Sequence, residues 1–450
     1  MIKDTIVAPA TTNMNNAVSV IRMSGENAIS IADSIFSKSI TKSTDRTLVY
    51  GKIRDKSGNI LDDCLCVKMI APKSYTGEDT VEFYCHGGQT VSECVIKEII
   101  LKGARLAEKG EFTKRAFLNG KMDLTQAESV IDIINSQTKN SLLMAQNNLD
   151  GKLRKKVDSI RQKVMNIIML IMAGNDFPDE TGDDISFEIK KSMEDVLKEI
   201  STLIKSYDKG KIIRDGFTCA ICGKPNVGKS SLLNAILSEE RAIVTDIEGT
   251  TRDVVTERVD IGGYIMNIAD TAGLRESSDK IEKIGIQKSY EYMNSVDLVL
   301  YVIDLSKTLS DEEKNEINSL NNDCILILNK TDLNKDIESF DIRKDIPIVM
   351  ISAKNNENID TLMEKIKEKV ENRLKKSTTE ETIFSQRHFE CLVNASEYLS
   401  KAIETISFCY EPDIASIDLE NCASSLGEIT GTTVNDEVID NIFKNFCIGK

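Results

Sequence analysis

Short apolar runs typical of β-strands dominate the chain up to residue 118. They occur at Thr5–Ala8, Ala17–Met23, Thr47–Ile53, Leu61–Met69 and Thr80–Cys85. Apolar residues with helical spacing follow over Val91–Lys102. Strand-like runs combined with a helix-like pattern predict a small α/β domain over residues 1–118.

Residues 121–176 carry a helical pattern instead. Between Val157 and Ile171 the apolar residues recur three and four positions apart, with Lys and Arg between them, which predicts an amphipathic helix. Pro178 ends this run. Neither the segment 119–210 nor the segment 376–450 can bury its apolar faces alone, so we expect the two to pack together as one helical domain. The further helical patterns in them are Ser186–Lys205, Gln386–Ser407 and Ser416–Phe446.

The segment between them, residues 211–375, alternates strand-like and helix-like runs. Continuous apolar runs of this length are typical of strands that are buried on both faces of a parallel sheet. We therefore predict an α/β domain inserted in the helical one, with polar connections at Ser206–Gly216 and Lys375–Glu381. The strand-like runs are Phe217–Cys222, Tyr264–Ala269, Cys324–Leu328 and Pro347–Ile351.

Composition narrows the class of protein. A chain of 450 residues with 41% hydrophobic residues and six Pro is expected to form two or three folded domains. It has no run of 18 apolar residues, and Met1–Ala10 lacks the basic and apolar regions of a signal peptide. We therefore expect a cytoplasmic protein with no membrane span.

Cysteine and charge exclude two further classes. The chain has 11 Cys and two His, a composition that disfavours a disulfide framework or a zinc site and favours reduced core cysteines. The net charge of −15 argues against a large nonspecific nucleic-acid surface. It leaves open an RNA substrate held by a local patch or presented by a partner.

The most informative motif is the octapeptide GKPNVGKS at residues 223–230. It fits the pattern Gly-x-x-x-x-Gly-Lys-Ser and lies between the strand-like run Phe217–Cys222 and the helix-like run Ser231–Leu237. In that context backbone N–H groups can cradle phosphates. Lys229 can then reach the β- and γ-phosphates, and Ser230 can ligate Mg²⁺.

Further nucleotide motifs follow in order along the chain. Residues 245–251 read TDIEGTT, in which Thr251 can give Mg²⁺ a second hydroxyl ligand. Asp270-Thr-Ala-Gly273 follows a strand, so Asp270 can hold Mg²⁺ through water and Gly273 can donate its N–H to the γ-phosphate.

The motif Asn329-Lys-Thr-Asp332 predicts the base that is bound. A carboxylate at Asp332 can accept hydrogen bonds from guanine N1 and N2, whereas adenine offers no such pair of donors. We therefore predict a GTP-binding domain. Its expected nucleotide contacts are Asn226, Val227, Gly228, Lys229, Ser230, Ser231, Thr245, Asp246, Ile247, Glu248, Gly249, Thr250, Thr251, Asp270, Thr271, Ala272, Gly273, Asn329, Lys330, Asp332, Ser352, Ala353 and Lys354.

The residue that orients the attacking water is not evident from the motifs. Ras-like proteins use a Gln just after Asp-x-x-Gly, but Leu274 stands there. Carboxylates within Glu276–Glu282 are candidates, and Arg252, Arg275 or a bound cation could neutralise the developing charge. The motifs alone do not rank these alternatives.

The whole chain resembles the MnmE (TrmE) tRNA-modification GTPases. The segments that carry the resemblance, besides TDIEGTTRD, are Asp4–Ala8, Ile21–Gly25, Tyr75–Asp79 with Glu82, His86–Gly88, Gly110–Lys121, Asp176–Glu180 and Phe446–Lys450. The resemblance implies a multidomain α/β plus all-α fold: an N-terminal α/β folate-binding-like domain that dimerises, a helical bundle domain, and an inserted P-loop (Ras-like) GTPase domain. The expected domains are residues 1–118, then 119–210 with 376–450, and 211–375.

The resemblance also implies a function. It implies a potassium-dependent GTP hydrolase that works as a homodimer with an FAD-containing partner, MnmG (GidA), in a heterotetramer. Together they would install a carboxymethylaminomethyl or aminomethyl group at carbon 5 of the tRNA wobble uridine. The one-carbon unit would come from 5-formyl-tetrahydrofolate or a related folate.

Residue roles follow from the same resemblance by position. Folate would contact Arg22, Glu82, Lys121 and Lys450 in the N-terminal domain. K⁺ would be held by Asn226, Thr245, Ile247 and Thr250, and dimerisation of the GTPase domains would order that loop. Glu282 would position the attacking water through a second water.

Two other function classes stay open at this point. One is a ribosome-assembly GTPase that acts as a binding switch, although no basic RNA-binding appendage is visible at a pI of 4.9. The other is a folate-dependent transferase that acts alone, with GTP binding purely regulatory. No Gly-x-Gly-x-x-Gly follows a strand-like run, so the chain itself offers no FAD site.

Overall fold

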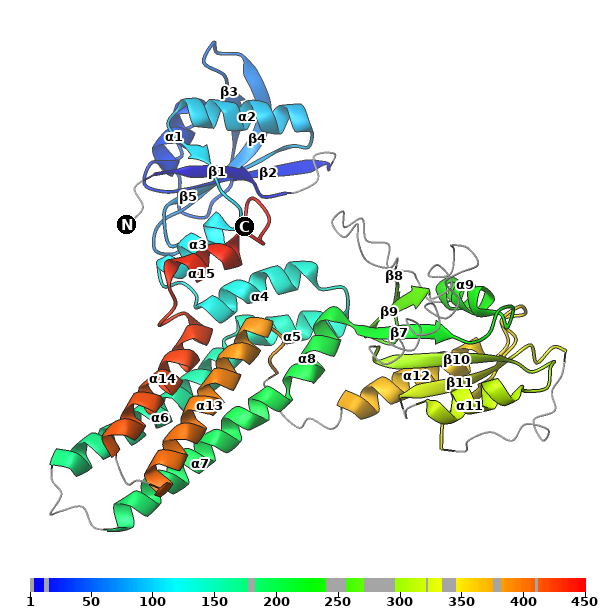
Figure 1. Cartoon of the computed structure of the whole chain (residues 1–450). Coiled ribbons are helices and arrows are strands. Elements are labelled where there is room, and N and C mark those ends of the chain that lie inside the picture. The colour runs from blue at the N-terminus through cyan, green and yellow to red at the C-terminus, as the bar shows by residue number, and fades with distance from the viewer. Residues whose placement is uncertain are drawn as a thin grey trace, which may run out of the picture. The chain divides into compact units, whose positions relative to one another are not determined.

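The computed structural model describes residues 4–11, 16–176, 183–239, 256–270, 296–320, 323–333, 345–374, 382–408 and 412–450 (Figure 1). The chain forms two compact units. The first unit comprises Met1–Ile134, Asn147–Val196 and Asn394–Lys450, and the second comprises Asn135–Gln146 and Leu197–Val393. The predicted domain boundaries stay predictions.

A six-stranded sheet in the order β3-β4-β5-β2-β1-β6 organises the N-terminal part of the first unit. All five predicted strands are present, and β6 adds a short edge strand. One face of the sheet forms a core with α1 and α2. The bounds are β1 Ile6–Pro9, β2 Val18–Ser24, α1 Ala28–Ile35, β3 Val49–Arg54, β4 Ile60–Met69, β5 Thr80–His86, α2 Gln89–Leu101, β6 Arg105–Leu106 and α3 Glu111–Leu118.

Helix α1 was not predicted from the sequence. Its buried residues Ala28, Ile31, Ala32 and Ile35 have the spacing of an amphipathic helix, and that spacing could have revealed it. The helix is only eight residues long, which makes its pattern hard to separate from that of a loop.

Helices make up the rest of the first unit, and two of the predicted helical stretches are divided. Residues 121–176 form α4 (Leu124–Asn135), α5 (Lys139–Leu149) and α6 (Lys152–Asp176), and the last stretch forms α14 (Pro412–Thr430) and α15 (Asp436–Phe443). The second unit includes α5 up to Gln146. Gly431 separates α14 from α15 at φ 87°, where a Cβ would lie 2.9 Å from the ring of Phe117. The apolar stripe predicted between Val157 and Ile171 is buried as expected.

The second unit is built on a six-stranded sheet in the order β12-β11-β10-β7-β9-β8, parallel except for β8. The sheet contributes to two hydrophobic cores. Helices α9 and α12 pack in the first core, and α11 packs in the second. Helices α7 (Asp183–Lys205) and α13 (Gln386–Phe408) contribute to both units. The remaining bounds are α8 Tyr207–Asp215, β7 Phe217–Cys222, α9 Lys229–Glu239, β8 Thr256–Asp260, β9 Ile265–Asp270, β10 Leu298–Asp304, α11 Asp311–Ser319, β11 Cys324–Asn329, β12 Ile348–Met350 and α12 Ile359–Leu374.

The polar linker predicted at Ser206–Gly216 is wrong, because this segment is helix α8. Ile212 is buried in the core of the sheet. Gly210 packs so closely on another segment that a Cβ would lie 2.0 Å from the carbonyl oxygen of Ile383. The hydroxyl of Ser206 accepts a hydrogen bond from the backbone N–H of Ile383. The helix is therefore stabilised both by burial of Ile212 and by contacts of Ser206 and Gly210 with the distant residue Ile383.

Candidate functional site

The predicted nucleotide motifs follow strands β7, β9, β11 and β12 of the second unit. These strands are parallel to one another, so their carboxyl ends meet at one edge of the sheet (Figure 1). In open sheets of this kind, ligands bind at that edge. The sheet topology therefore brings the predicted phosphate and base motifs to one site.

Two glycines shape the loop between β7 and α9. Gly223 and Gly228 have φ values of 132° and 101°, which favour glycine. Added Cβ atoms would lie 2.3 Å from the carbonyl oxygen of Val302 and 2.2 Å from Nδ2 of Asn329, respectively. Helix α9 begins directly after the loop, at Lys229. The helix N-terminus therefore follows a loop whose two glycines leave the backbone N–H groups uncovered by side chains. A phosphate site requires this arrangement.

The predicted phosphate ligands lie on the first turn of α9. Nζ of Lys229 donates hydrogen bonds to the carbonyl oxygens of Gly223 and Lys224, at 2.9 Å and 2.8 Å. The side chain therefore arches back over the loop. Ser230 and Ser231 are exposed, which leaves their hydroxyls accessible to a phosphate or a cation.

Asn329 joins the base-reading turn to the phosphate loop. Its buried amide Nδ2 donates to the carbonyl oxygen of Val227 at 2.8 Å. Its Oδ1 accepts from the backbone N–H of Ala353 at 3.0 Å. One side chain thus ties together the loops that follow β7, β11 and β12.

Asp332 and Ser352 lie on the outer side of this junction. The hydroxyl of buried Ser352 donates to Oδ1 of exposed Asp332 at 2.8 Å. That hydrogen bond joins the loop that follows β11 to the loop that follows β12 and holds the carboxylate in place. Lys354 is exposed on the second of them.

Lys330 makes a further link that involves a residue absent from the predicted set. Its Nζ donates to the carbonyl oxygen of Asn226 at 3.0 Å and to Oδ2 of Asp304 at 2.6 Å. Burial raises the pKa of Asp304, but hydrogen bonds from Lys330 and Ser306 outweigh it and hold the pKa below its ordinary value. A lone charge that ends the apolar strand LVLYVID was the sequence signal for Asp304.

Several predicted residues lie outside the described part of the chain. Asp270 is the last residue of β9, and the structure does not describe its side chain. The others are Thr245, Asp246, Ile247, Glu248, Gly249, Thr250, Thr251, Thr271, Ala272, Gly273 and Glu282, with the candidates Arg252 and Arg275 and the segment Glu276–Glu282.

A second polar site lies in the first unit, around two of the predicted folate contacts. Strands β2 and β5 place Arg22 opposite Glu82, and Nε of Arg22 donates to Oε1 of Glu82 at 2.7 Å. The guanidinium lies 5.7 Å from the ring centroid of Tyr75 and 5.8 Å from that of Phe112. The site therefore combines a cation, a carboxylate and two aromatic faces.

Segment 446–450 reaches the same site. Nη1 of Arg22 donates to the carbonyl oxygen of Gly449 at 3.4 Å. A Cβ on Gly449 would lie 2.1 Å from the carbonyl oxygen of Pro9, so the segment packs tightly against the end of β1. Lys450 follows directly. Lys121 lies on another loop, where its Nζ donates to the carbonyl oxygen of Pro72 at 2.9 Å.

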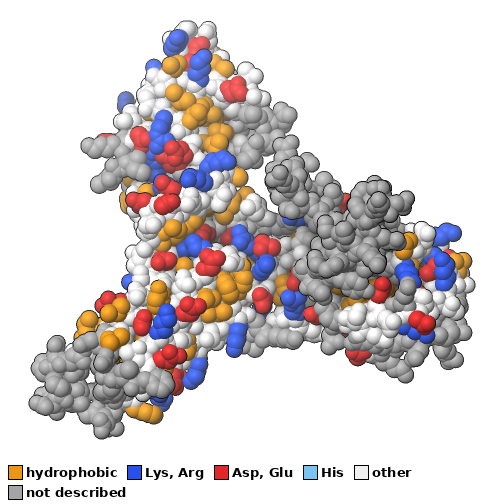
Figure 2. Space-filling view, in the orientation of Figure 1, with side chains coloured by type: hydrophobic (Ala, Val, Ile, Leu, Met, Phe, Trp, Pro, Cys, Tyr) orange, Lys and Arg blue, Asp and Glu red, His pale blue; other side chains and the backbone are white. Residues whose placement is uncertain are grey.

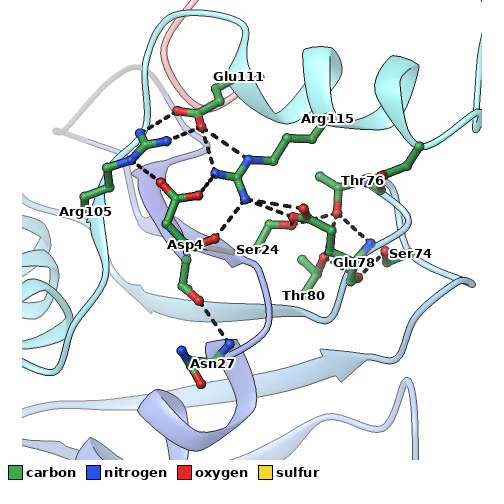
Figure 3. A network of polar contacts seen from close by, with 12 residues as sticks. Asp4, Ser24, Asn27, Ser74, Thr76, Glu78, Thr80, Arg105, Glu111 and Arg115 are labelled. Carbon is green, nitrogen blue, oxygen red and sulfur yellow. Dashed lines mark hydrogen bonds and ion pairs between the residues drawn. The ribbon is translucent and has the colours of Figure 1, made fainter. Parts of the chain in front are cut away.

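A buried network of charges supports this second site (Figure 3). Arg115 is 1% exposed, and its guanidinium contacts Asp4, Glu78 and Glu111 at 2.7, 3.2 and 2.8 Å. Arg105 pairs with Asp4 and Glu111 in the same network. The network joins α3, β6, the start of β1 and the loop before β5.

The loop held by the network carries one of the aromatic residues. Oε2 of Glu78 accepts a hydrogen bond from Ser24, two residues beyond Arg22 on β2. Tyr75 precedes it on the same loop, and its hydroxyl bonds that of Thr113 on α3 at 2.9 Å. These hydrogen bonds attach the loop that carries Tyr75 to β2 through Glu78 and to α3 through Tyr75 itself.

The described residues offer no cluster suited to a metal ion, and most of their cysteines are buried. None of those residues form a cluster of three or more metal-binding side chains, and eight of the ten described cysteines are buried thiols. Within the same part of the chain, no helix has the length and apolar character to cross a membrane. On the face shown in Figure 2, described Lys and Arg side chains are interspersed with Asp and Glu.

Comparisons with known proteins identify the family of the chain. The family model "MnmE helical domain" matches residues 124–447, and the model "GTP-binding protein TrmE N-terminus" matches residues 5–121. A solved structure, the G domain of the T. maritima iron transporter FeoB, is 28% identical over 34% of this chain and 97% of that chain, with a TM-score of 0.25. A TM-score that low supports no conclusion about this chain.

Curated relatives match from end to end. The tRNA modification GTPase MnmE of Carboxydothermus hydrogenoformans is 42% identical over 461 residues, and that of Natranaerobius thermophilus is 44% identical over 459 residues. Both alignments cover 100% of this chain and 100% of the relative. With relatives this similar over their full length, the chain belongs to the MnmE (TrmE) family of tRNA modification GTPases.

Proposed function

We propose that this chain binds and hydrolyses GTP, and that hydrolysis serves the modification of tRNA. The observation that carries the proposal is the junction at Asn329, which joins the predicted guanine-reading turn to the phosphate loop. A base and a phosphate chain of one nucleotide can be bound together only if the two elements are held in a fixed relation.

Two metal ions belong to the proposed mechanism. Ser230 and Thr251 would hold Mg²⁺, which neutralises phosphate charge, and the exposed hydroxyl of Ser230 on the first turn of α9 fits that role. Asn226, Thr245, Ile247 and Thr250 would hold K⁺, which adds positive charge near the phosphates. Asn226 fits, because it is exposed on the phosphate loop with φ 62°.

The finer chemistry is proposed for the site around Arg22. Folate carries glutamate carboxylates and a flat pterin ring. A guanidinium suits the carboxylates, Glu82 can accept hydrogen bonds from ring N–H groups, and aromatic faces such as Tyr75 can stack on the ring. Arg22, Glu82, Lys121 and Lys450 would thus hold a one-carbon folate such as 5-formyl-tetrahydrofolate, with FAD-containing MnmG as the partner for carbon 5 of the wobble uridine.

A homodimer through the N-terminal sheet forms part of the proposal. The face opposite α1 and α2 carries a row of paired side chains across four strands: Tyr50, Leu65, Tyr84 and Val20. Tyr50 and Leu65 are 57% and 38% exposed. Apolar rows of this kind are typical of interfaces between protein surfaces, which supports dimerisation by this domain.

The function is tested by measuring modified nucleosides in total tRNA, by mass spectrometry, from cells with and without the protein. We expect 5-substituted wobble uridines to disappear without it and to return with the wild type but not with Lys229→Ala. An unchanged nucleoside profile contradicts the proposal. Accumulation of ribosomal precursors in the same cells would then favour the ribosome-assembly function.

Glu282→Ala should separate GTP binding from GTP hydrolysis. Because this residue is proposed to position the attacking water, binding should stay unchanged while the rate falls at least about a hundred-fold. The measurement is phosphate release at saturating GTP in K⁺ buffer, with Glu257→Ala, which removes an exposed carboxylate of β8, as the control. Wild-type turnover in the Glu282 variant would remove this residue from its proposed role.

Asp332→Asn should change which base is bound. The amide can no longer accept both guanine N–H groups, but it can donate to the extra carbonyl of xanthine. We expect the preference to move from guanine towards xanthine nucleotides by about a hundred-fold. Competition binding with GDP and xanthosine diphosphate measures the ratio, and an unchanged ratio would show that the base is read elsewhere.

A further inference from the structure

Asp304 ends strand β10 and is buried, at 5% exposure. Its two carboxylate oxygens have separate partners. Oδ1 accepts hydrogen bonds from the backbone N–H and the hydroxyl of Ser306, at 3.0 Å and 2.6 Å. Oδ2 accepts from Nζ of Lys330 at 2.6 Å. The two hydrogen bonds to Oδ1 hold a local turn at Ser306, and the hydrogen bond to Oδ2 connects Asp304 to the base-reading turn.

Lys330 carries this contact on to the phosphate loop. Its Nζ also donates to the carbonyl oxygen of Asn226 at 3.0 Å, so the ammonium bridges a carboxylate and a loop carbonyl. Both Lys330 and Asn226 have positive φ values, 70° and 62°. Residues with side chains seldom adopt this region, and such a conformation persists only where its surroundings fix it.

Strand register keeps the bridge in place. Asp304 pairs with Asn329 in the parallel ladder of β10 and β11, and the next N–H, of Leu305, donates to the carbonyl oxygen of Asn329 at 2.9 Å. Asp304 therefore lies beside Asn329, which joins the base and phosphate elements, and it bonds Lys330 of the base-reading turn directly.

We propose that Asp304 is a positioning residue of the nucleotide site: through Lys330 it fixes the backbone at Asn226, and thereby the shape of the phosphate loop. The inference rests on the proposed GTP function. It assigns Asp304 a role in affinity for the phosphate chain and none in the choice of base, because Asp332 and Ser352 are held by a separate hydrogen bond.

A purely structural role for Asp304 makes different predictions. If only the Ser306 turn mattered, Ser306→Ala would have the larger effect, and Asp304→Asn, which keeps an acceptor at Oδ1, would have little. Lys307 is a poor alternative partner, since its Nζ is 4.0 Å from Oδ2 and its side chain is 72% exposed.

The test is a titration of full-length wild type and variants with fluorescently labelled GDP and GTP. We expect Asp304→Asn to weaken binding of both nucleotides about ten-fold, which is the size of one lost charge-assisted hydrogen bond. The ratio of affinities for GDP and xanthosine diphosphate should stay unchanged. Ser306→Ala is the matched control and should bind like the wild type. Thermal unfolding midpoints establish that each variant is folded.

A variant that lacks the Lys330 ammonium tests whether Asp304 acts through Lys330. In a Lys330→Met chain, Asp304→Asn should have no further effect, because the two residues act as one unit. Wild-type affinity in Asp304→Asn, an equal loss in Ser306→Ala, or an undiminished loss in the Lys330→Met background would each overturn the inference while leaving the proposed function intact. A wild type that binds no guanine nucleotide would overturn both.

Discussion

Replacing Lys229 with alanine is expected to reduce GTP hydrolysis by at least about a thousand-fold. The lysine begins α9, and its ammonium arches over the phosphate loop onto the carbonyl oxygens of Gly223 and Lys224. That position suits a cation for the β- and γ-phosphates, where negative charge grows in the transition state. Alanine removes the charge but favours the helix, so the fold should persist.

Phosphate release at saturating GTP measures this effect, with nucleotide binding followed in parallel. Lys211→Ala is a suitable control, because it removes an exposed lysine from α8 in the same unit. Hydrolysis within a few-fold of the wild type in the Lys229 variant would mean that the loop does not bind the reacting phosphates.

Arg115→Met is expected to lower the free energy of unfolding of the first unit by about 3 kcal/mol or more. The guanidinium is the partner of three carboxylates, those of Asp4, Glu78 and Glu111. Methionine fills a similar volume but removes the cation that Glu78 contacts and leaves Asp4 and Glu111 with Arg105 as their cationic partner among the described residues. Removing one member of a buried ionic network leaves charge without a partner, which costs more than the network contributes.

Urea unfolding of the full chain, followed by probes in the N-terminal sheet, measures the loss. The control is Lys114→Met on the same helix, because Lys114 forms an exposed ion pair with Asp440 at 2.5 Å. Exposed pairs contribute less than about 1 kcal/mol. Equal losses in the two variants would show that the buried network contributes no more than a surface pair.

The network also makes a pH-dependent contribution with a defined sign. Burial raises the pKa values of Asp4 and Glu111, but their hydrogen bonds, chiefly from Arg105 and Arg115, outweigh it and lower these pKa values below the ordinary 3.8 and 4.5. Groups with lowered pKa values stabilise the fold above their unfolded-state pKa. That stability is lost as pH falls through the folded-state pKa. Acid unfolding should therefore be less steep in Arg115→Met.

The sequence predicted the elements whose signal is local. Strands such as Phe217–Cys222 and Cys324–Leu328 were found because buried parallel strands are continuous apolar runs. The helical stripe on α6 was found because each of its apolar residues lies three or four positions from the next. The phosphate-loop glycines were identified from the Gly-x-x-x-x-Gly-Lys-Ser motif, and the structure shows why glycine is needed there: their φ values are positive and the adjacent atoms leave no space for a side chain.

What the sequence did not reveal depends on distant partners. Helix α8 was taken for a linker, since its stabilising contact is with Ile383, and nothing near residue 210 indicates that partner. Asp304 was missed because its role depends on an ion pair with Lys330, which lies 26 residues further along the chain, and no local pattern indicates that pair. Folate contacts such as Arg22 came from family resemblance alone, since a lone arginine in a strand has no distinguishing pattern.

The contact between Arg22 and Gly449 has a consequence for how the protein is made. The two residues are 427 positions apart, and chains grow at about 5–20 residues per second. The ribosome therefore delivers Gly449 roughly 20–85 seconds after Arg22, long after the N-terminal sheet can form. A chain whose synthesis stalls before residue 449 can carry a folded sheet and a folded second unit without the contact between Arg22 and Gly449. The polar site around Arg22 is therefore completed only after translation has passed residue 449.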